Sequence, residues 1–210
     1  MATTTNYGWT TPDDTSLVKD GASAIRSLGT AIDTSLNTAL GTRKAGLVLL
    51  NTTSFSGVSS QSLSANTFTS TYENYKLIFT FTALSASNQT ITMKLRASGT
   101  DSSTGYYFER VRNENGSITG TRFSNNDTFF VGSYDSTSPS RNYKEVNLYS
   151  PQLAVLTSYN STGNYVSADA SLKTETMGGY HSSATAYDSI SIIPSSGTMT
   201  GTVRVYGYNN

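Results

Sequence analysis

Two hydrophobic periods divide the chain. Between residues 12 and 41 apolar side chains recur at helical spacing, and from residue 46 onward they alternate with polar ones. The first pattern is typical of an amphipathic helix and the second of half-buried strands. The sequence therefore predicts one N-terminal helix in front of a mainly β body.

The helix is expected to begin at Pro12 and to end before Gly41. Thr11 is a favourable N-cap residue, and proline suits the first helical position. Glycine suits the position just after a helix, where a left-handed backbone conformation is common. A helix of this length would extend roughly 43 Å at 1.5 Å per residue.

A seven-residue apolar repeat runs along this helix. Its seam consists of Val18, Ile25, Leu28 and Ile32. Repeated β-branched residues at core positions favour self-association, and repeated Ile favours three strands. The alternative is that the stripe packs on the chain's own β domain, which is the commonest role of such a stripe. The seam covers only about three heptads, so an association through it would need help from the domain behind it.

Strand patterns continue from residue 46 to the C-terminus, with turn residues between them. The clearest covers Asn74–Leu84, where Tyr75, Leu77 and Phe79 occupy alternate positions. The other expected strands are 46–51, 90–97, 106–112, 128–134, 143–149, 152–159, 166–176, 189–193 and 202–208. Roughly ten strands at this spacing predict an antiparallel β-sandwich of jelly-roll type. The expected divisions are a segment 1–11, a helix 12–41 and a sandwich 46–210.

Composition narrows the possible functions. The chain has 210 residues, 14 basic and 14 acidic, 13% of them charged, and no cysteine. Without a basic excess, nucleic acid and anionic membrane surfaces are not expected partners. The lack of cysteine excludes disulfides and thiolate metal sites. No apolar run reaches the roughly 20 residues of a spanning helix, so membrane insertion is not expected.

Candidate catalytic residues are sparse. His181 is the only histidine, and no Gly-x-Ser-x-Gly motif nominates a serine nucleophile. The acidic residues are scattered, so a carboxylate pair for glycoside hydrolysis could form only in space. We therefore expect no catalytic residues, no metal site and no cofactor, and a protein that is not an enzyme.

Tyrosines accompanied by Asn and Ser are the more suggestive group. Tyrosine supplies rigid contact area and the small polar residues supply adaptable hydrogen bonds. Aromatic rings also stack on the faces of sugars. The segments richest in this mixture, expected to be loops, are 113–127 and 178–187. The candidate receptor surface consists of Asn125, Asn126, Asp127, Tyr180, His181 and Tyr187.

The opening segment Tyr-Gly-Trp-Thr-Thr-Pro at 7–12, with the patterned stretch 18–33, resembles the N-terminal segment of many tailed-bacteriophage fibre and minor structural proteins. The closing stretch 194–207 is similar to the end of β-sandwich domains in phage fibres and spikes. This resemblance implies a homotrimer whose N-terminus docks on other virion proteins and whose distal domain lies outside the particle. Carried onto this chain, it makes Tyr7, Trp9 and Pro12 the docking residues.

The expected function is therefore that of a virion structural protein, a trimeric fibre or knob whose sandwich binds host surface polysaccharide. Long fibre repeats are missing, so both tail and capsid locations stay open. A capsid decoration protein without receptor binding is the alternative, and a glycan-degrading enzyme is a third. Trp9, the only tryptophan, has two interpretations: a staple against the first helical turn, or an anchor in a partner's pocket.

Overall fold

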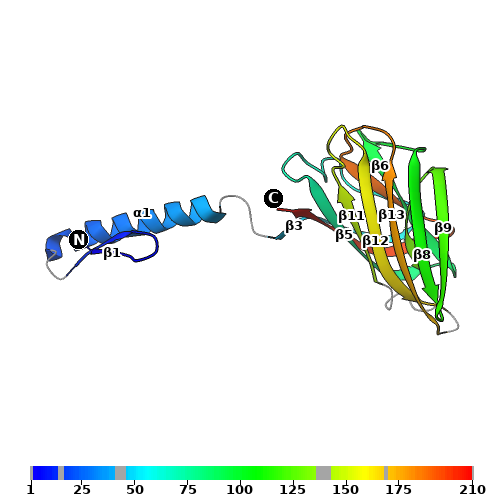
Figure 1. The fold of residues 1–210 in the computed structure, drawn as a ribbon, viewed down its shortest axis with the longest axis horizontal. Coiled ribbons are helices and arrows are strands. Elements are labelled where there is room, and N and C mark those ends of the chain that lie inside the picture. Colours follow the sequence, from blue (N-terminus) through cyan, green and yellow to red (C-terminus); the bar gives the residue numbers. More distant parts are fainter. Residues whose placement is uncertain (1, 14–16, 41–45, 136–142, 168–169, 210) are drawn as a thin grey trace. The chain divides into compact units, whose positions relative to one another are not determined.

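The computed structural model describes residues 2–13, 17–40, 46–135, 143–167 and 170–209. The chain divides into two compact units, Met1–Gly46 and Leu47–Asn210. The first unit contains a short hairpin and a helix, and the second contains two antiparallel sheets (Figure 1).

The N-terminal unit begins with a hairpin instead of a helix. Strands β1 (Ala2–Thr3) and β2 (Thr10–Thr11) pair antiparallel, and α1 covers Gly21–Leu40 after the short 3-10 helix η1 (Val18–Asp20). The expected helix start at Pro12 is thus wrong. A residue before proline favours an extended backbone, and Thr11 uses that conformation to pair with Ala2. The expected helix-ending residue, Gly41, lies outside the described part of the chain.

The hairpin packs on one side of the helix through Trp9. The indole Nε1 donates a 2.9 Å hydrogen bond to Ser35 Oγ, and the ring stacks on Tyr7 at 5.0 Å. Trp9 therefore contacts the C-terminal half of the helix. The staple interpretation had instead placed it against the first helical turn. Among the helix side chains that the structure describes, Ala24 is buried, whereas Val18 in η1 and Ile25 in α1 are 97% and 66% exposed.

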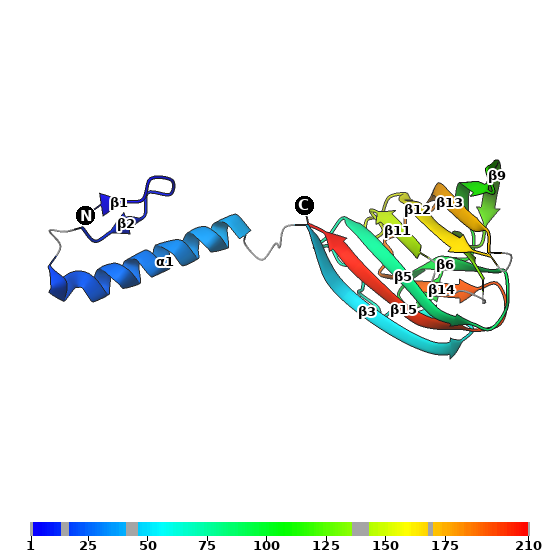
Figure 2. The same cartoon turned by 90° about the horizontal axis from the view of Figure 1, so that it is seen from below.

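The second unit is built from two sheets. The larger has eight strands in the order β3 (Leu47–Val58), β15 (Met199–Tyr208), β5 (Asn74–Leu84), β11 (Tyr143–Tyr149), β12 (Thr157–Val166), β13 (Leu172–His181), β8 (Tyr106–Glu114) and β9 (Ser117–Asn126). The smaller has the order β10 (Phe129–Tyr134), β6 (Gln89–Ala97), β14 (Ser189–Pro194) and β4 (Gln61–Ser62), and β7 (Thr100–Asp101) pairs with β6. Figure 2 shows the long strands of the larger sheet curving past β6 and β14.

The mainly β, antiparallel class expected from the sequence is confirmed. The strand order differs from a jelly roll, which has eight strands in two Greek keys. Here eight strands lie in one sheet, and β11, β12 and β13 follow one another in the chain as neighbours. Strands β5 and β11 have the expected bounds. Strand β9 falls within a segment that was expected to be a loop.

Alternation places one face of each sheet in a shared core. On β5 the side chains of Tyr75, Leu77 and Phe79 are buried, while Lys76 and Ile78 face outward and are half-buried. Aromatic side chains bridge the sheets: the Phe129 and Tyr159 rings lie 3.9 Å apart, and Phe81 meets Tyr134 edge-on. Burial of these large side chains supplies the main favourable free energy of folding.

A buried carboxylate connects the two sheets. Glu175 on β13 accepts hydrogen bonds from the backbone N–H and the hydroxyl of Ser133 on β10, both at 2.9 Å. Its closest ion-pair partner is Lys144 on β11, whose Nζ lies 2.8 Å from Oε2; both side chains are fully buried. Burial raises the pKa of Glu175, but the Lys144 ammonium and the Ser133 bonds outweigh it, so this pKa lies below its ordinary value.

Gly132 provides the space for the lysine. A Cβ at this position would lie 2.3 Å from Lys144 Cε, a distance that real contacts do not show. Burial lowers the pKa of Lys144 despite the attraction of Glu175. Because a charged group is costly to bury without a partner, this part of the core depends on the ion pair.

We expect Glu175→Gln to lower the free energy of unfolding by about 3–5 kcal/mol, because it leaves the Lys144 ammonium buried without its carboxylate. Lys144→Met should cost less, since Glu175 would keep its two bonds from Ser133. Urea unfolding followed by circular dichroism measures both changes.

The matched control is Glu145→Gln on the outer face of β11, where the carboxylate pairs with Lys76 at 2.6 Å and is partly exposed. Its cost should stay below about 1 kcal/mol, as for surface ion pairs. Equal losses for the two glutamates would contradict the role assigned to Glu175.

Candidate functional site

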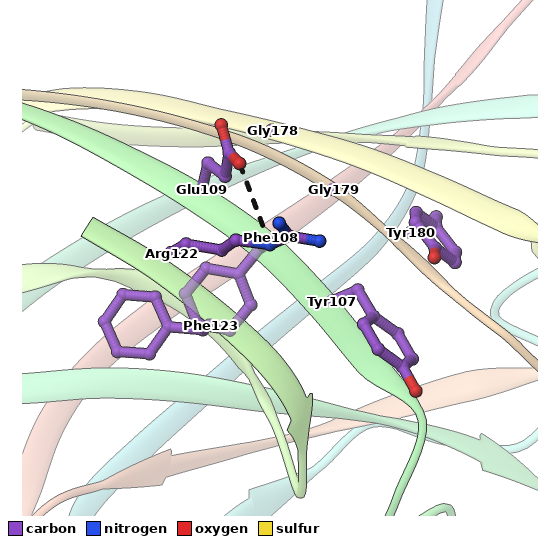
Figure 3. A pocket seen from close by; sticks show the side chains of 8 residues that line it. All are labelled: Tyr107, Phe108, Glu109, Arg122, Phe123, Gly178, Gly179 and Tyr180. Atoms are coloured by element: carbon purple, nitrogen blue, oxygen red, sulfur yellow. Dashed lines mark ion pairs between the residues drawn. The ribbon is translucent and has the colours of Figure 1, made fainter. Parts of the chain in front are cut away.

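An aromatic groove lies on the outer face of the eight-stranded sheet, near its β9 edge. It is formed by β8, β9 and β13 and has a volume of about 220 Å³. Its lining residues, shown in Figure 3, are Tyr107, Phe108, Glu109, Arg122, Phe123, Gly178, Gly179 and Tyr180. We refer to this feature as the outer groove.

Two tyrosines form one end of the outer groove. Tyr107 and Tyr180 are paired across β8 and β13, and their rings lie nearly parallel with centroids 5.2 Å apart. Tyr180 is 42% exposed. The face of an aromatic ring carries a negative quadrupole, so C–H bonds on one side of a sugar ring pack favourably on it. This end can therefore hold the apolar face of a sugar.

Two glycines form the floor. Gly179 allows the strands to approach closely, because a Cβ there would lie 2.2 Å from the carbonyl oxygen of Tyr107. Gly178 faces outward and pairs with Glu109, and a Cβ added at this position would meet no other atom within 4 Å. The open space of the outer groove is thus the space that a side chain at Gly178 would fill.

A carboxylate and a guanidinium form the other end (Figure 3). Glu109 Oε1 and Arg122 Nε lie 4.0 Å apart, and both side chains are more than 70% exposed. An exposed ion pair of this kind contributes little to stability. Both groups therefore stay available to hydrogen-bond a ligand, with Glu109 accepting and Arg122 donating.

The inner wall is rigid because it belongs to the core. Phe108 is buried and stacks on Phe123 at 4.5 Å, and it meets Tyr159 edge-on. The Arg110 guanidinium lies 5.8 Å from the Phe123 ring centroid. A ligand in the outer groove would thus bind strands that the core already holds in place, which lowers the cost of ordering.

The expected receptor residues fall into three groups. Tyr180 lines the outer groove. Asn125 and Asn126 end β9 and Asp127 follows them, outside the groove; Asn125 Oδ1 accepts from the Gly105 N–H, and Asp127 lies 3.8 Å from Lys94. These three polar residues therefore lie where β9 leads into β10.

The prediction that His181 and Tyr187 belong to the receptor surface is wrong, because both side chains are buried. His181 is 1% exposed and ends β13 between the rings of Tyr106 and Tyr187. A Gly- and Ser-rich neighbourhood suggested an exposed loop, but residues 178–181 belong to a strand. Packing of β13 against the core, which the local sequence does not show, buries this end.

Hydrogen bonds fix the state of His181. The Ser183 N–H and the Tyr187 hydroxyl lie 3.2 Å from Nδ1, which accepts, so Nε2 carries the proton and donates to the Thr104 carbonyl at 2.9 Å. Ser102 Oγ is also 3.0 Å from Nε2. Because Nε2 is a donor in this state, it cannot take a proton from Ser102. The arrangement is a structural network and not a nucleophile–base pair.

Sequence reasoning missed Glu109, Arg122 and Gly178 as groove residues. On β8, Tyr107 and Glu109 alternate with the buried Tyr106 and Phe108. This alternation indicates that Tyr107 and Glu109 share the outer face, and it is the one sequence pattern that could have pointed to the groove. The third strand, β9, was not expected.

The N-terminal docking and seam residues differ in exposure. Tyr7 is 70% exposed and Pro12 is exposed, whereas Trp9 is half-buried through its contact with Ser35. In the seam, Leu28 and Ile32 are half-buried, in contrast to Val18 and Ile25.

Among the described residues, no three His, Cys, Asp or Glu side chains are grouped as a metal site would require. In the same part of the chain, no helix has both the length and the apolar character needed to cross a membrane.

Acidification should destabilise the protein through His181. Burial lowers the pKa of His181, and the hydrogen bond to Thr104 offsets this only in part. Between pH 7.5 and about 5.5 the unfolded chain then binds more protons than the folded one, so stability falls as pH falls. Since His181 is the only histidine, His181→Gln should flatten this dependence. Urea midpoints at the two pH values measure it, and equal slopes in both proteins would contradict the assignment.

Comparison of the chain with family models, curated proteins and solved structures gives no match. The features of the chain that bear on its function are therefore the outer groove, the exposed apolar residues of the N-terminal unit and the resemblance carried by residues 7–33.

Proposed function

We propose that this chain is a non-enzymatic structural protein of a tailed-bacteriophage virion, a trimeric fibre or knob that binds host surface polysaccharide. The observation that carries the binding role is the outer groove, in which paired tyrosines face an exposed ion pair across a glycine floor. The virion assignment is supported by the resemblance of residues 7–33.

The outer groove suits one sugar residue of a longer chain. Its volume of about 220 Å³ is below the roughly 300–1,000 Å³ of pockets for drug-sized ligands. The tyrosine pair would contact the apolar face of the sugar, and Glu109 and Arg122 would bind its hydroxyl groups. The groove is open on the outer face of the sheet, so a polymer could continue beyond it.

The helix supports self-association into a trimer. The hairpin covers the side that contains Ala24 and Ser35, whereas Val18 and Ile25, seven residues apart in the seam, stay more than half exposed. Such a stripe at heptad spacing is satisfied by two further copies of the same helix. The helix also has no acidic residue in its first turn and no basic residue in its last. Charged side chains within it therefore do not stabilise the helix dipole.

The exposed residues of the hairpin are the proposed contact with other virion proteins. Tyr7 and Pro12 are available for such a contact, and the Trp9 ring supports Tyr7 by stacking. In this proposal the protein is on the particle surface, with the β unit exposed, and neither nucleic acid nor a membrane is a partner.

We expect Gly178→Val to abolish binding of host surface polysaccharide, because the side chain would occupy the outer groove, and its Cβ would meet no other atom within 4 Å. Tyr180→Ala should weaken binding at least tenfold through loss of the stacking ring. Binding is measured by co-sedimentation with host cells and by calorimetry with the extracted polysaccharide.

The controls are Gly120→Val, on β9 with equally open space, and Tyr149→Ala, a 38% exposed tyrosine on β11. Both should bind as the unaltered protein does. If the unaltered protein does not bind, a capsid decoration role without receptor binding replaces this proposal, and release of reducing ends from the polysaccharide would instead indicate an enzyme.

Light scattering at micromolar concentration should give the mass of three chains. Ile25→Lys should convert the trimer to monomers, because it places a charge in the apolar seam. Ser27→Lys, on the opposite side of the helix and exposed, should leave the trimer intact. A monomeric unaltered protein would contradict the trimer.

A further inference from the structure

A second pocket lies between the two sheets and shares no residue with the outer groove. Strands β6 and β10 of the smaller sheet and β8, β12 and β13 of the larger one contribute to it, and its volume is about 250 Å³. Its lining residues are Asn88, Thr90, Arg112, Ser133, Tyr134, Tyr165 and Lys173. The Glu175–Lys144 ion pair adjoins it through Ser133.

Positive charge predominates around this pocket. The described cations are Lys144, Arg110, Arg112 and Lys173, and the described carboxylates are Glu175, Glu114 and Asp135, which follows Tyr134. Burial lowers the pKa of Arg110, and the positive charge of the nearby Arg112 lowers it further. One more negative charge would therefore be stabilised here.

The carboxylate of Glu175 already has hydrogen-bond partners. Glu175 accepts from Lys144 and from both donors of Ser133. Its contact with Arg112 Nε is long, at 3.4 Å, and lacks the alignment of a hydrogen bond. Arg112 thus has a buried N–H that no acceptor in the described residues satisfies.

Tyr134 adds a second unsatisfied group. Its side chain is 1% exposed, and its hydroxyl has no hydrogen-bond partner among the residues that the structure describes. Burial raises the pKa of Tyr134 well above its ordinary value, and the nearby charge of Glu175 adds to this. The hydroxyl therefore stays protonated and is a donor. A buried donor without an acceptor is costly, which points to a ligand that supplies the acceptor.

We propose that this pocket binds an oxyanion, the carboxylate or sulfate group of an acidic sugar or a free anion of the same kind. The Tyr134 hydroxyl and Arg112 Nε donate to its oxygens, and Lys173 at the side of the pocket adds charge. Charge-assisted bonds of this type are about twice as strong as neutral ones. Asn88 and Thr90 supply neutral polar groups for the remainder of the ligand.

Thermal unfolding of the whole chain tests the proposal with sodium sulfate and sodium glucuronate as probes, against sodium chloride at equal ionic strength and neutral glucose. A saturable rise in Tm of about 3–5 °C is expected at roughly tenfold the dissociation constant. A response to sulfate alone identifies a free inorganic anion as the ligand, and a response to glucuronate identifies an acidic sugar.

Tyr134→Phe separates a binding role from a structural one. In sodium chloride without sulfate or glucuronate it should leave Tm unchanged or raise it, because the hydroxyl removed has no partner. It should also remove most of the anion-dependent rise, as should Lys173→Gln. The control Lys94→Gln, on β6 and paired with Asp127 outside this pocket, should respond as the unaltered protein does.

An equal, non-saturating rise in all variants is the general effect of excluded salts and would overturn the proposal. A loss of stability in Tyr134→Phe in sodium chloride alone would overturn it too, since the hydroxyl would then already be bonded. Because the two sites share no residue, their tests are independent. Polysaccharide binding in the outer groove can fail while the anion response persists, and the anion response can fail while polysaccharide binding persists.

Discussion

The carboxylate of Glu175 is the constraint on which the β unit depends. It lies on the larger sheet, takes two hydrogen bonds from Ser133 on the smaller one, and is neutralised by Lys144. A charge can stay in a core only when its partners are held in place, so this contact fixes the sheets relative to each other. The same strand, β13, turns Gly178 and Tyr180 outward. One strand thus has a charge network on its inner face and a proposed sugar site on its outer face.

Local pattern was sufficient for strands that are buried on one face and end at turn residues. Asn74–Leu84 and Tyr143–Tyr149 were expected with the bounds observed. Strand β9 was missed because it lies at a sheet edge with nearly every side chain exposed, so no alternation of apolar and polar residues is needed there. Gly178 and Gly179 suggested a loop, yet Gly179 is required by the close approach of the neighbouring strand, which only the folded sheet reveals.

The candidate sites were less accessible to sequence reasoning because each gathers residues from distant segments. Tyr107 and Tyr180 become neighbours through the pairing of β8 with β13, and no spacing in the chain indicates that pairing. His181 looked exposed beside glycine and serine, but the rings of Tyr106 and Tyr187 enclose it. The N-terminal helix was expected correctly in kind, whereas its start was not, because the hairpin competes for the residues near Pro12.

Gly132 and Lys144 restrict each other's evolution. Any side chain at position 132 would collide with the lysine stem, and a shorter residue at position 144 would leave Glu175 without its ammonium. Positions 132, 144 and 175 should therefore vary as a set. Replacement of Lys144 by a shorter residue must come before any replacement of Gly132 by a larger one. In a set of diverged sequences this would be recorded as three-way covariation, a sign of the buried charge that needs no structure to detect.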